Sequence, residues 1–364
     1  MSSKLVPPAQ KASNQSSLNK SASNQSAPNI VIVGAGAIGM LIYHQLTHAT
    51  SLNNTPSKPT KPLLLGRNFC LSTTDIQTQS LTVETFSDDS LINDTIVQPC
   101  LVNNLSAVTS EQLSNIELVI MCVKSYQVND AVAALIDKLP SKVTLLLLHN
   151  GLGPHLQVIK LIETHQRDDI CLYLGTTSQA ALKVGQLHVR QTGTGKTVIG
   201  KIRGAAISQQ LESILLSTIP NSETHSNILL GLWQKLIVNC AINPLTAIEQ
   251  CNNGQLAQAQ YQDRINAIAT ECIEVAKAAG VQLSLTESLS TIYNVIQLTA
   301  NNFSSMYQDV KHQRTTEIKQ INGFVTMQAK RHNINVPVNQ HMFEKISSLT
   351  TYKGKHSSNK ITIE

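Results

Sequence analysis

The sequence lacks the patterns that identify three large classes of protein. No stretch of about five or six like charges occurs, so there is no basic arm for nucleic acid, although the net charge is +5. No uninterrupted apolar run reaches the roughly 20 residues that a membrane-spanning helix needs. The seven cysteines are dispersed and include no Cys-x-x-Cys pair, which argues against a disulfide framework or a metal site. The dispersed cysteines suit a reducing, cytoplasmic compartment, and we expect neither a nucleic-acid nor a membrane partner.

The first 28 residues differ in composition from the rest of the chain. They are rich in Ser, Asn, Gln and Lys, and Ala-Ser-Asn-Gln-Ser occurs at 12–16 and again at 22–26. Such a segment buries too little apolar area to offset its ordering entropy, so residues 1–28 are predicted to form a disordered tail. It lacks the apolar centre of a secretory signal. An organellar transit peptide stays open, because the segment has no acidic residue, although it also has no Arg.

A glycine-rich turn follows the first predicted strand. Residues 29–33 are an apolar strand, residues 34–39 read Gly-Ala-Gly-Ala-Ile-Gly, and residues 40–46 continue as a helix. Between a strand and a helix, this spacing predicts a dinucleotide site in which the phosphates face the helix N-terminus. The first glycine permits the tight turn, the second the approach of the pyrophosphate, and the third close helix packing. A glycine-rich turn without a ligand is the alternative.

The end of the second predicted strand indicates which dinucleotide binds. Residues 50–62 look like an inserted loop, and the strand Leu63-Leu64-Leu65 then ends in Gly66-Arg67. Sites for NAD usually carry Asp or Glu here, whereas Arg accommodates the 2′-phosphate of NADP. Arg67 therefore favours NADP(H), with a solvated surface arginine as the alternative.

Two further apolar strands, at 118–123 and 143–148, fit a parallel sheet that is covered on both faces. Ligands of such sheets bind beyond the carboxyl ends of the strands, where Lys124, Gln127 and Asn150 lie. Each of these side chains could equally be ordinary loop polarity. Short strands are also predicted at 171–174, 186–190 and 197–200, with turns at 183–185 and 193–195, and the alternating run at 186–190 predicts an antiparallel extension of the sheet. Gly193-Thr194-Gly195-Lys196 lacks the first glycine of a phosphate loop, so a hairpin turn is predicted there.

From about residue 227 the pattern becomes helical. Lys235, Asn239 and Asn243 are spaced four apart within an otherwise apolar segment, so on a helix they form one narrow polar stripe. Such a stripe indicates a buried helix that lines a polar cleft, or a buried polar network between helices. Pro244 is predicted to end or kink this helix. Further helices are predicted at 261–279, 285–301 and 314–333, with Glu317 as a candidate solvated acid of a first turn.

Several of these segments closely resemble the ketopantoate reductase family. The resemblance rests on residues 235–247 with Asn253-Gly254, on residues 302–310, and on Arg314-Thr315-Thr316-Glu317-Ile318. In the first half it includes residues 34–39, 123–127, 149–151 and 175–177. It runs in order from about Asn29 to about Tyr352, and the chain departs from the family pattern in its N-terminal tail and in the longer stretch before Arg67.

The resemblance implies an α/β fold with an N-terminal Rossmann-type doubly wound domain at 29–226. An all-α domain like the C-terminal domain of 6-phosphogluconate dehydrogenase would follow at 227–364. It also implies NADPH-dependent reduction of 2-dehydropantoate (ketopantoate) to (R)-pantoate, on the route to pantothenate and coenzyme A, by a monomer or homodimer.

The family's site residues map onto this sequence position by position. By resemblance, Lys235 is the general acid and Glu317 the second catalytic group. The substrate residues would be Asn150, Asn239, Asn243, Asn253, Asn302 and Ser305. The cofactor residues would be Gly34, Ala35, Gly36, Ala37, Ile38, Gly39, Arg67, Lys124, Gln127 and Asn150.

Two other functions stay open at this level. Another two-domain dehydrogenase of β-hydroxy acids or sugar phosphates would have the same layout. An NADPH-binding sensor would keep the cleft without the chemistry, although a pure binder needs no proton donor such as Lys235.

Overall fold

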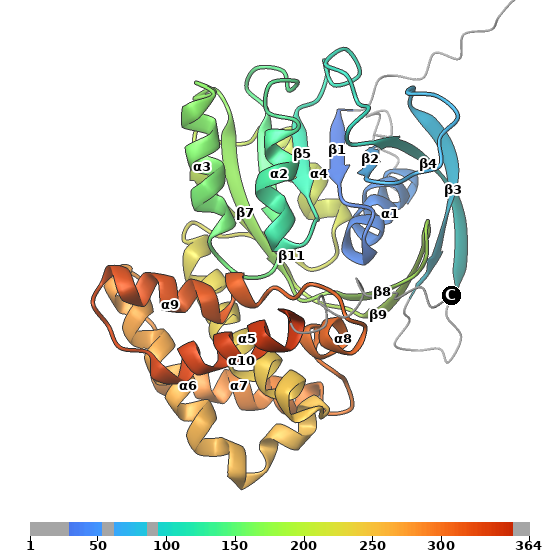
Figure 1. Cartoon of the computed structure of the whole chain (residues 1–364). Helices are drawn as coiled ribbons and strands as arrows, with labels where there is room; N and C mark the ends of the chain where they lie inside the picture. The colour runs from blue at the N-terminus through green and yellow to red at the C-terminus, as the bar shows by residue number, and fades with distance from the viewer. Residues whose placement is uncertain (1–28, 53–61, 86–93, 352–364) are drawn as a thin grey trace, which may run out of the picture.

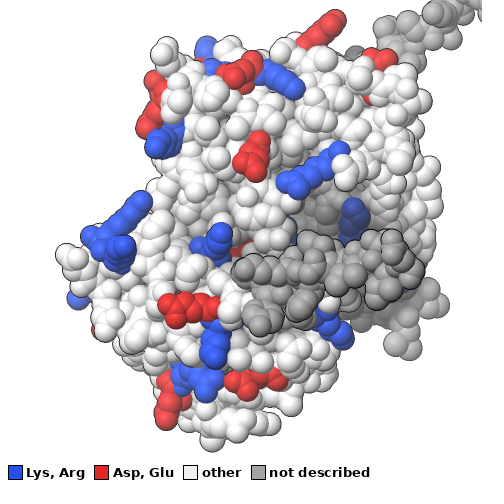
Figure 2. All heavy atoms as spheres, in the orientation of Figure 1, with Lys and Arg blue, Asp and Glu red and all other residues white. Residues whose placement is uncertain are grey.

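The computed structural model describes residues 29–52, 62–85 and 94–351. The predicted tail at 1–28 and most of the predicted insertion at 50–62 lie outside these residues. On the face shown in Figure 2, basic and acidic side chains are interspersed over the described surface.

A parallel sheet forms the centre of the N-terminal half (Figure 1). Its six parallel strands have the spatial order β4-β2-β1-β5-β6-β7, which is the order of a doubly wound dinucleotide-binding sheet. The order reverses between β1 and β5, and the ends of these strands form the crevice where ligands of such sheets bind. The strands are β1 (Ile30–Val33), β2 (Leu63–Gly66), β4 (Thr95–Asn104), β5 (Leu118–Met121), β6 (Thr144–Leu148) and β7 (Cys171–Thr177).

Helices cover both faces of this sheet, as its continuous apolar strands require. Ile30 and Ile32 of β1 pack with the residues of α1 (Ala37–Leu52) and α4 (Gln209–Thr218). Val31 and Val33 point the other way and share a core with α2 (Val128–Ala133) and α3 (Pro154–Thr164). The predicted doubly wound fold is confirmed.

Shorter strands extend the sheet at both ends. Beyond β7 lie the antiparallel β10 (Thr197–Arg203) and then β11 (Ser222–Thr224). Beyond β4 lie β3 (Gln77–Glu84), β9 (His188–Gly193) and the edge strand β8 (Ala180–Gly185). The antiparallel extension was therefore predicted, but β3, β4 and β8 were not.

Of the two turns predicted in this region, the one at 183–185 is misplaced, and the one at 193–195 separates two strands as predicted but is not a hairpin. Residues 183–185 belong to β8, which pairs with β9 as far as Gly185, so the hairpin turns at Gln186-Leu187. The Gly193–Gly195 segment connects β9 to β10, which are not neighbours in the sheet, and is therefore not a hairpin turn. Lys183 and Gln186 consequently lie on a hairpin whose arms are β8 and β9.

The described chain after residue 227 is helical and is built around one central helix. Helix α5 (Ile228–Glu249) contacts α6 (Ala259–Ala278), α7 (Leu285–Leu298), α8 (Ser305–Lys311) and α10 (Pro337–Thr351). By length and composition α5 could cross a membrane, but 67% of its most apolar window is buried inside the protein, as expected of a core helix. The predicted domain boundary between residues 226 and 227 stays a prediction; strand structure ends just before it, at Thr224.

Pro244 was predicted to end or kink helix α5, and it does not end it, because the helix continues for five further residues to Glu249. A proline inside a helix cannot donate to the carbonyl four residues earlier, which is that of Cys240. The Asn322 side chain supplies that donor, with its Nδ2 3.2 Å from the Cys240 oxygen. A residue far along the chain thus satisfies the acceptor that the local sequence leaves free.

The predicted helix at 314–333 is also wrong. The segment contains the short 3₁₀ turn η3 (Ile318–Gln320) and then α9 (Asn322–Arg331), separated by Ile321 in a non-helical conformation with φ −105° and ψ −102°. Glu317 immediately precedes η3 and is only 4% exposed. It is therefore not the solvated acid of a helical first turn.

A buried carboxylate fixes α10 against α6. Glu271 of α6 accepts hydrogen bonds from the backbone N–H groups of Val338 and Asn339 at 2.9 and 2.8 Å, in the first turn of α10. It also accepts one from the Asn339 side chain at 2.8 Å. These donors would otherwise be unpaired at a helix N-terminus.

We expect Glu271→Ala to destabilise the protein by about 2–3 kcal/mol, because it leaves buried donors without an acceptor. Urea unfolding followed by circular dichroism measures this change. Glu274→Ala, an exposed position on the same helix, is the matched control and should change stability by less than about 0.5 kcal/mol. Equal midpoints for the two variants would show that Glu271 does not anchor α10.

Candidate active site

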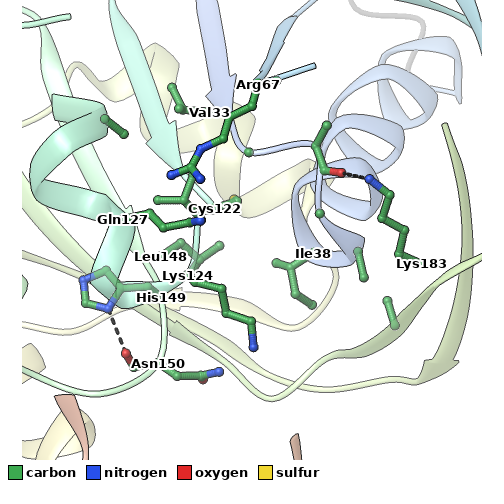
Figure 3. Close-up of a pocket in the computed structure, with 18 of the residues that line it drawn as sticks. Val33, Ile38, Arg67, Cys122, Lys124, Gln127, Leu148, His149, Asn150 and Lys183 are labelled. Atoms are coloured by element: carbon green, nitrogen blue, oxygen red, sulfur yellow. Dashed lines mark hydrogen bonds between the residues drawn. The ribbon is translucent and has the colours of Figure 1, made fainter. Parts of the chain in front are cut away.

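A cleft of about 810 Å³ lies at the carboxyl ends of the parallel strands. The glycine loop and the segments after β2, β5 and β6 form one side of it (Figure 3). Lys235, Ser305 and Glu317 line it from the helical part of the chain. The structure thus brings together twelve predicted site residues, namely Gly34, Ala35, Gly36, Ala37, Ile38, Arg67, Lys124, Gln127, Asn150, Lys235, Ser305 and Glu317.

The three glycines of the loop fit a bound dinucleotide. Gly34 has φ +115°, and a Cβ there would lie 2.8 Å from the Cys122 carbonyl oxygen, so the turn requires glycine. A Cβ on Gly39 would lie 1.9 Å from the Gly34 oxygen, because helix and loop are packed together at that point. A Cβ on Gly36 would meet nothing within 4 Å, which leaves the backbone open to the cleft where a pyrophosphate would approach.

Arg67 lies at the rim of the cleft, at the end of β2, where its side chain is exposed and next to Gln127 (Figure 3). With the Gln127 amide oxygen turned towards it, that oxygen accepts from both terminal guanidinium nitrogens at 3.0 and 3.1 Å. Gln127 therefore orients the guanidinium without neutralising it. An oriented, uncompensated guanidinium suits a phosphate ligand.

Lys235 is placed by the middle of α5. Its ammonium donates to the Thr177 carbonyl oxygen at 2.6 Å, at the end of β7. Burial lowers the pKa of Lys235 to about 8, although the negative charge of Glu317 acts in the opposite direction. The side chain is therefore charged at neutral pH but loses its proton more easily than an ordinary lysine.

The carboxylate of Glu317 accepts hydrogen bonds from the N-terminal half. One oxygen accepts from the Ser125 backbone N–H at 2.9 Å and from the Ser125 hydroxyl at 2.8 Å. The other oxygen accepts from the Asn150 side chain at 3.3 Å. Ser125 was not predicted as a site residue, although it directly follows Lys124 and lies within residues 123–127, which carry the family resemblance.

Lys124 forms a second connection across the cleft. Its ammonium lies 2.9 Å from Asp309 of α8 and 4.0 Å from Glu317. Burial opposes its positive charge, but the two carboxylates outweigh this effect and raise the pKa of Lys124. Asp309 also accepts from Arg314 at 2.9 Å. Asp309 lies within the segment that carries the resemblance, but no role was predicted for it.

Five predicted site residues do not line this cleft. Gly39 lies behind the loop. Further along α5 than Lys235, Asn239 is half-buried and Asn243 is buried. Asn253 is buried and donates to the Thr299 hydroxyl at 2.8 Å, whereas Asn302 is exposed. Within the described chain, the polar stripe on α5 therefore reaches the cleft only at Lys235, and a substrate role for the asparagines stays a prediction.

His149 also lines the cleft and was not predicted as a site residue. Its Nδ1 is 3.0 Å from the Asn150 carbonyl oxygen, and its Nε2 is buried without a hydrogen-bond partner in the described part of the chain. Burial lowers the pKa of this imidazole, which is neutral at pH 7 as a result.

Among the described residues no group of three or more His, Cys, Asp and Glu could hold a metal ion.

One cleft brings together the glycine loop, the Lys235 ammonium with its lowered pKa and the buried Glu317 carboxylate. Together they indicate a class of enzyme. The loop suits a nicotinamide cofactor, and Lys235 can donate a proton to oxygen while it stabilises negative charge there. The fold and site are those of a nicotinamide-dependent oxidoreductase that acts on a CH–OH group.

The comparison with known families identifies the particular family. The family model described as ketopantoate reductase PanE/ApbA matches residues 30–204, and the model of its C-terminal part matches residues 227–349. The chain belongs to the ketopantoate reductase family. The resemblance inferred from the sequence motifs is thereby confirmed.

Individual relatives agree with this assignment. The 2-dehydropantoate 2-reductase of Vibrio cholerae is 32% identical over 325 residues, which cover 88% of this chain and 97% of the relative. The enzyme of the same name from Escherichia coli O157:H7 is 37% identical over 244 residues, or 67% of this chain and 77% of the relative.

Solved structures show the same fold. A PanE/ApbA family ketopantoate reductase from Ralstonia eutropha JMP134 has a TM-score of 0.73 at 24% identity and covers 89% of this chain and 99% of its own. D-mandelate dehydrogenase, solved with NADH and anilino(oxo)acetate, has a TM-score of 0.75 at 20% identity. The match covers 89% of this chain and 98% of the dehydrogenase chain.

We expect Gly36→Ala and Gly39→Ala to fail in different ways. Gly36→Ala should fold with nearly unchanged stability and bind the dinucleotide at least about tenfold more weakly, because its methyl group enters open space at the cleft. Gly39→Ala should lose about 1–3 kcal/mol of stability, because its methyl group would overlap the Gly34 oxygen. Thermal unfolding and cofactor titration separate the two effects; similar behaviour of the variants would contradict the assigned glycine roles.

Proposed function

We propose that this chain reduces 2-dehydropantoate to (R)-pantoate with NADPH, in the pathway to pantothenate and coenzyme A. The single observation that supports this most strongly is the convergence of Lys235, Glu317 and the glycine loop on one cleft. Relatives named 2-dehydropantoate 2-reductase support the substrate. A cytoplasmic location and a monomeric or homodimeric state belong to the same proposal.

The chemistry needs a hydride donor and a proton donor. When bound, the cofactor supplies the hydride from its nicotinamide C4. Reduction leaves negative charge on the former carbonyl oxygen, and the Lys235 ammonium stabilises that charge and delivers its proton there. The Thr177 carbonyl, which accepts from Lys235 at 2.6 Å, holds the ammonium in position before transfer.

We assign Glu317 to the substrate side of the same step. Its hydrogen bonds to Ser125 and Asn150 hold the carboxylate in one orientation, and its negative charge favours the protonated form of Lys235. The Glu317 carboxylate would accept from the substrate hydroxyl, and Ser305 would donate to the substrate carboxylate. Asn239, Asn243, Asn253 and Asn302 are proposed as substrate contacts on the strength of the family resemblance.

NADPH is proposed as the cofactor because of Arg67. Its guanidinium is oriented by the uncharged Gln127 amide, and no acid stands at the end of β2 to accept a ribose hydroxyl. Arg67 would bind the 2′-phosphate, while Gly34 to Ile38 hold the pyrophosphate and Lys124, Gln127 and Asn150 line the remaining path.

A steady-state assay with 2-dehydropantoate and NADPH, followed by NADPH absorbance beside a panel of other 2-keto acids, tests the proposal. Turnover of 2-dehydropantoate at the highest kcat/KM of the panel is expected. Preference for another keto acid would indicate a different dehydrogenase of the same layout. Cofactor binding without turnover of any keto acid would indicate a sensor.

For Lys235→Ala we expect kcat to fall by about 10²–10⁴-fold, the usual contribution of one general acid. Gln234→Ala, at the exposed neighbouring position of α5, should keep near-full turnover. In the unmodified enzyme, reduction should be independent of pH below about 8 and fall about tenfold per unit above it, as Lys235 loses its proton. Full turnover of Lys235→Ala at pH 7 would exclude Lys235 as the proton donor.

For Arg67→Ala we expect the Kd of NADPH to rise by about tenfold or more while the Kd of NADH changes little, since only NADPH loses a charge-assisted hydrogen bond. Isothermal titration measures both constants. Arg331→Ala, an exposed arginine at the end of α9, controls for net charge. If both cofactors weaken equally, the 2′-phosphate site lies elsewhere.

A further inference from the structure

The β8–β9 hairpin forms part of the cleft wall and belongs to none of the motifs described above. Ala180, Ala181, Lys183, Gln186 and Thr192 of this hairpin region line the cleft. Both strands contact α1, the helix that follows the glycine loop, and they run below it in the view of Figure 1. The hairpin therefore faces the phosphate-binding end of the cleft from the opposite side.

Two hydrogen bonds join the hairpin to the dinucleotide side of the cleft. The Lys183 ammonium donates to the Ala35 carbonyl oxygen at 2.8 Å, within the glycine loop itself (Figure 3). The Gln186 side chain donates to the Asn68 carbonyl oxygen at 3.0 Å, one residue after Arg67. The hairpin thus reaches both ends of the surface on which we propose that the cofactor phosphates lie.

Lys183 differs from the other basic residues of the cleft in the groups that interact with its charge. Lys124 pairs with Asp309, Lys235 is attracted by Glu317, and Arg67 is oriented by Gln127. Lys183 donates to a neutral carbonyl and forms no ion pair in the described ranges. Its side chain is exposed, and partial desolvation at the cleft lowers the pKa of its ammonium, with no carboxylate among the described residues acting in the opposite direction. An anion placed beside it would favour the charged form.

We propose that Lys183 is a phosphate-binding residue, which contacts the pyrophosphate of the dinucleotide from the β8–β9 hairpin. The proposal rests on the dinucleotide cofactor of the proposed function. Its ammonium already lies at the loop whose open Gly36 backbone would receive the pyrophosphate. An anionic oxygen is a stronger acceptor for an ammonium than a neutral carbonyl, so the ammonium would turn from Ala35 to the ligand. While the Lys183 ammonium turns to the ligand, the hydrogen bond from Gln186 to Asn68 would hold the hairpin in place.

Isothermal titration of the full chain with three ligands tests this role without turnover. The ligands are NADPH, 2′-phospho-ADP-ribose, which keeps the pyrophosphate but lacks nicotinamide, and adenosine 2′-monophosphate, which lacks the pyrophosphate. We expect Lys183→Gln to weaken the first two by about tenfold, the usual effect of losing one hydrogen bond to a charged group. Binding of adenosine 2′-monophosphate should not change, and Lys183→Arg should restore most of the affinity.

Lys201→Gln is the matched control, because Lys201 is an exposed lysine of β10 that does not line the cleft. It should leave all three constants unchanged, and the melting temperature of Lys183→Gln should equal that of the unmodified protein. Unchanged NADPH affinity in Lys183→Gln would overturn the inference and leave the proposed function intact. Weaker binding of adenosine 2′-monophosphate by Lys183→Gln would show that Lys183 contacts the 2′-phosphate instead of the pyrophosphate. Failure of the unmodified protein to bind NADPH would instead refute the proposed cofactor and, with it, this inference.

Discussion

The buried carboxylate of Glu317 is the constraint on which the site depends. A carboxylate that is 4% exposed is costly unless hydrogen-bond donors surround it, and here they come from the other half of the chain. Ser125 follows β5 and Asn150 follows β6, so the donors lie where the parallel strands end. The cost of leaving Glu317 unpaired therefore holds the segment before η3 against the carboxyl edge of the sheet and closes one side of the cleft.

The same carboxylate sets the electrostatics of the neighbouring lysines in two different ways. Lys124 lies close to both Glu317 and Asp309, and their attraction exceeds the effect of burial, so its charge is permanent at neutral pH. For Lys235, burial outweighs the attraction of Glu317, and the pKa of its ammonium falls to about 8. One lysine is thus suited to hold the two halves together and the other to release a proton, although both side chains line the same cleft.

Residues whose role follows from a local pattern were predicted from the sequence, and residues whose role follows from distant contacts were not. The glycine loop and Arg67 follow from short motifs and line the cleft. The parallel strands β1, β2, β5, β6 and β7 were predicted as strands, whereas β4 was not. Pro244 was predicted to end or kink α5 because local geometry forbids a helical hydrogen bond there. Asn322 of another helix supplies the missing donor, and no local pattern reports that contact.

The limits of the sequence are clearest for the groups that complete the cleft. Asp309 pairs with Lys124 across 185 positions of sequence, and Lys183 bonds Ala35 across 148. Neither contact could be foreseen, because no local pattern reports a pairing over such a separation. The turn predicted at 183–185 also excluded Lys183 from a strand. Once β8 extends to Gly185, the strand carries Lys183 to the glycine loop. The extent of one edge strand therefore decides whether Lys183 lies at the glycine loop and lines the cleft.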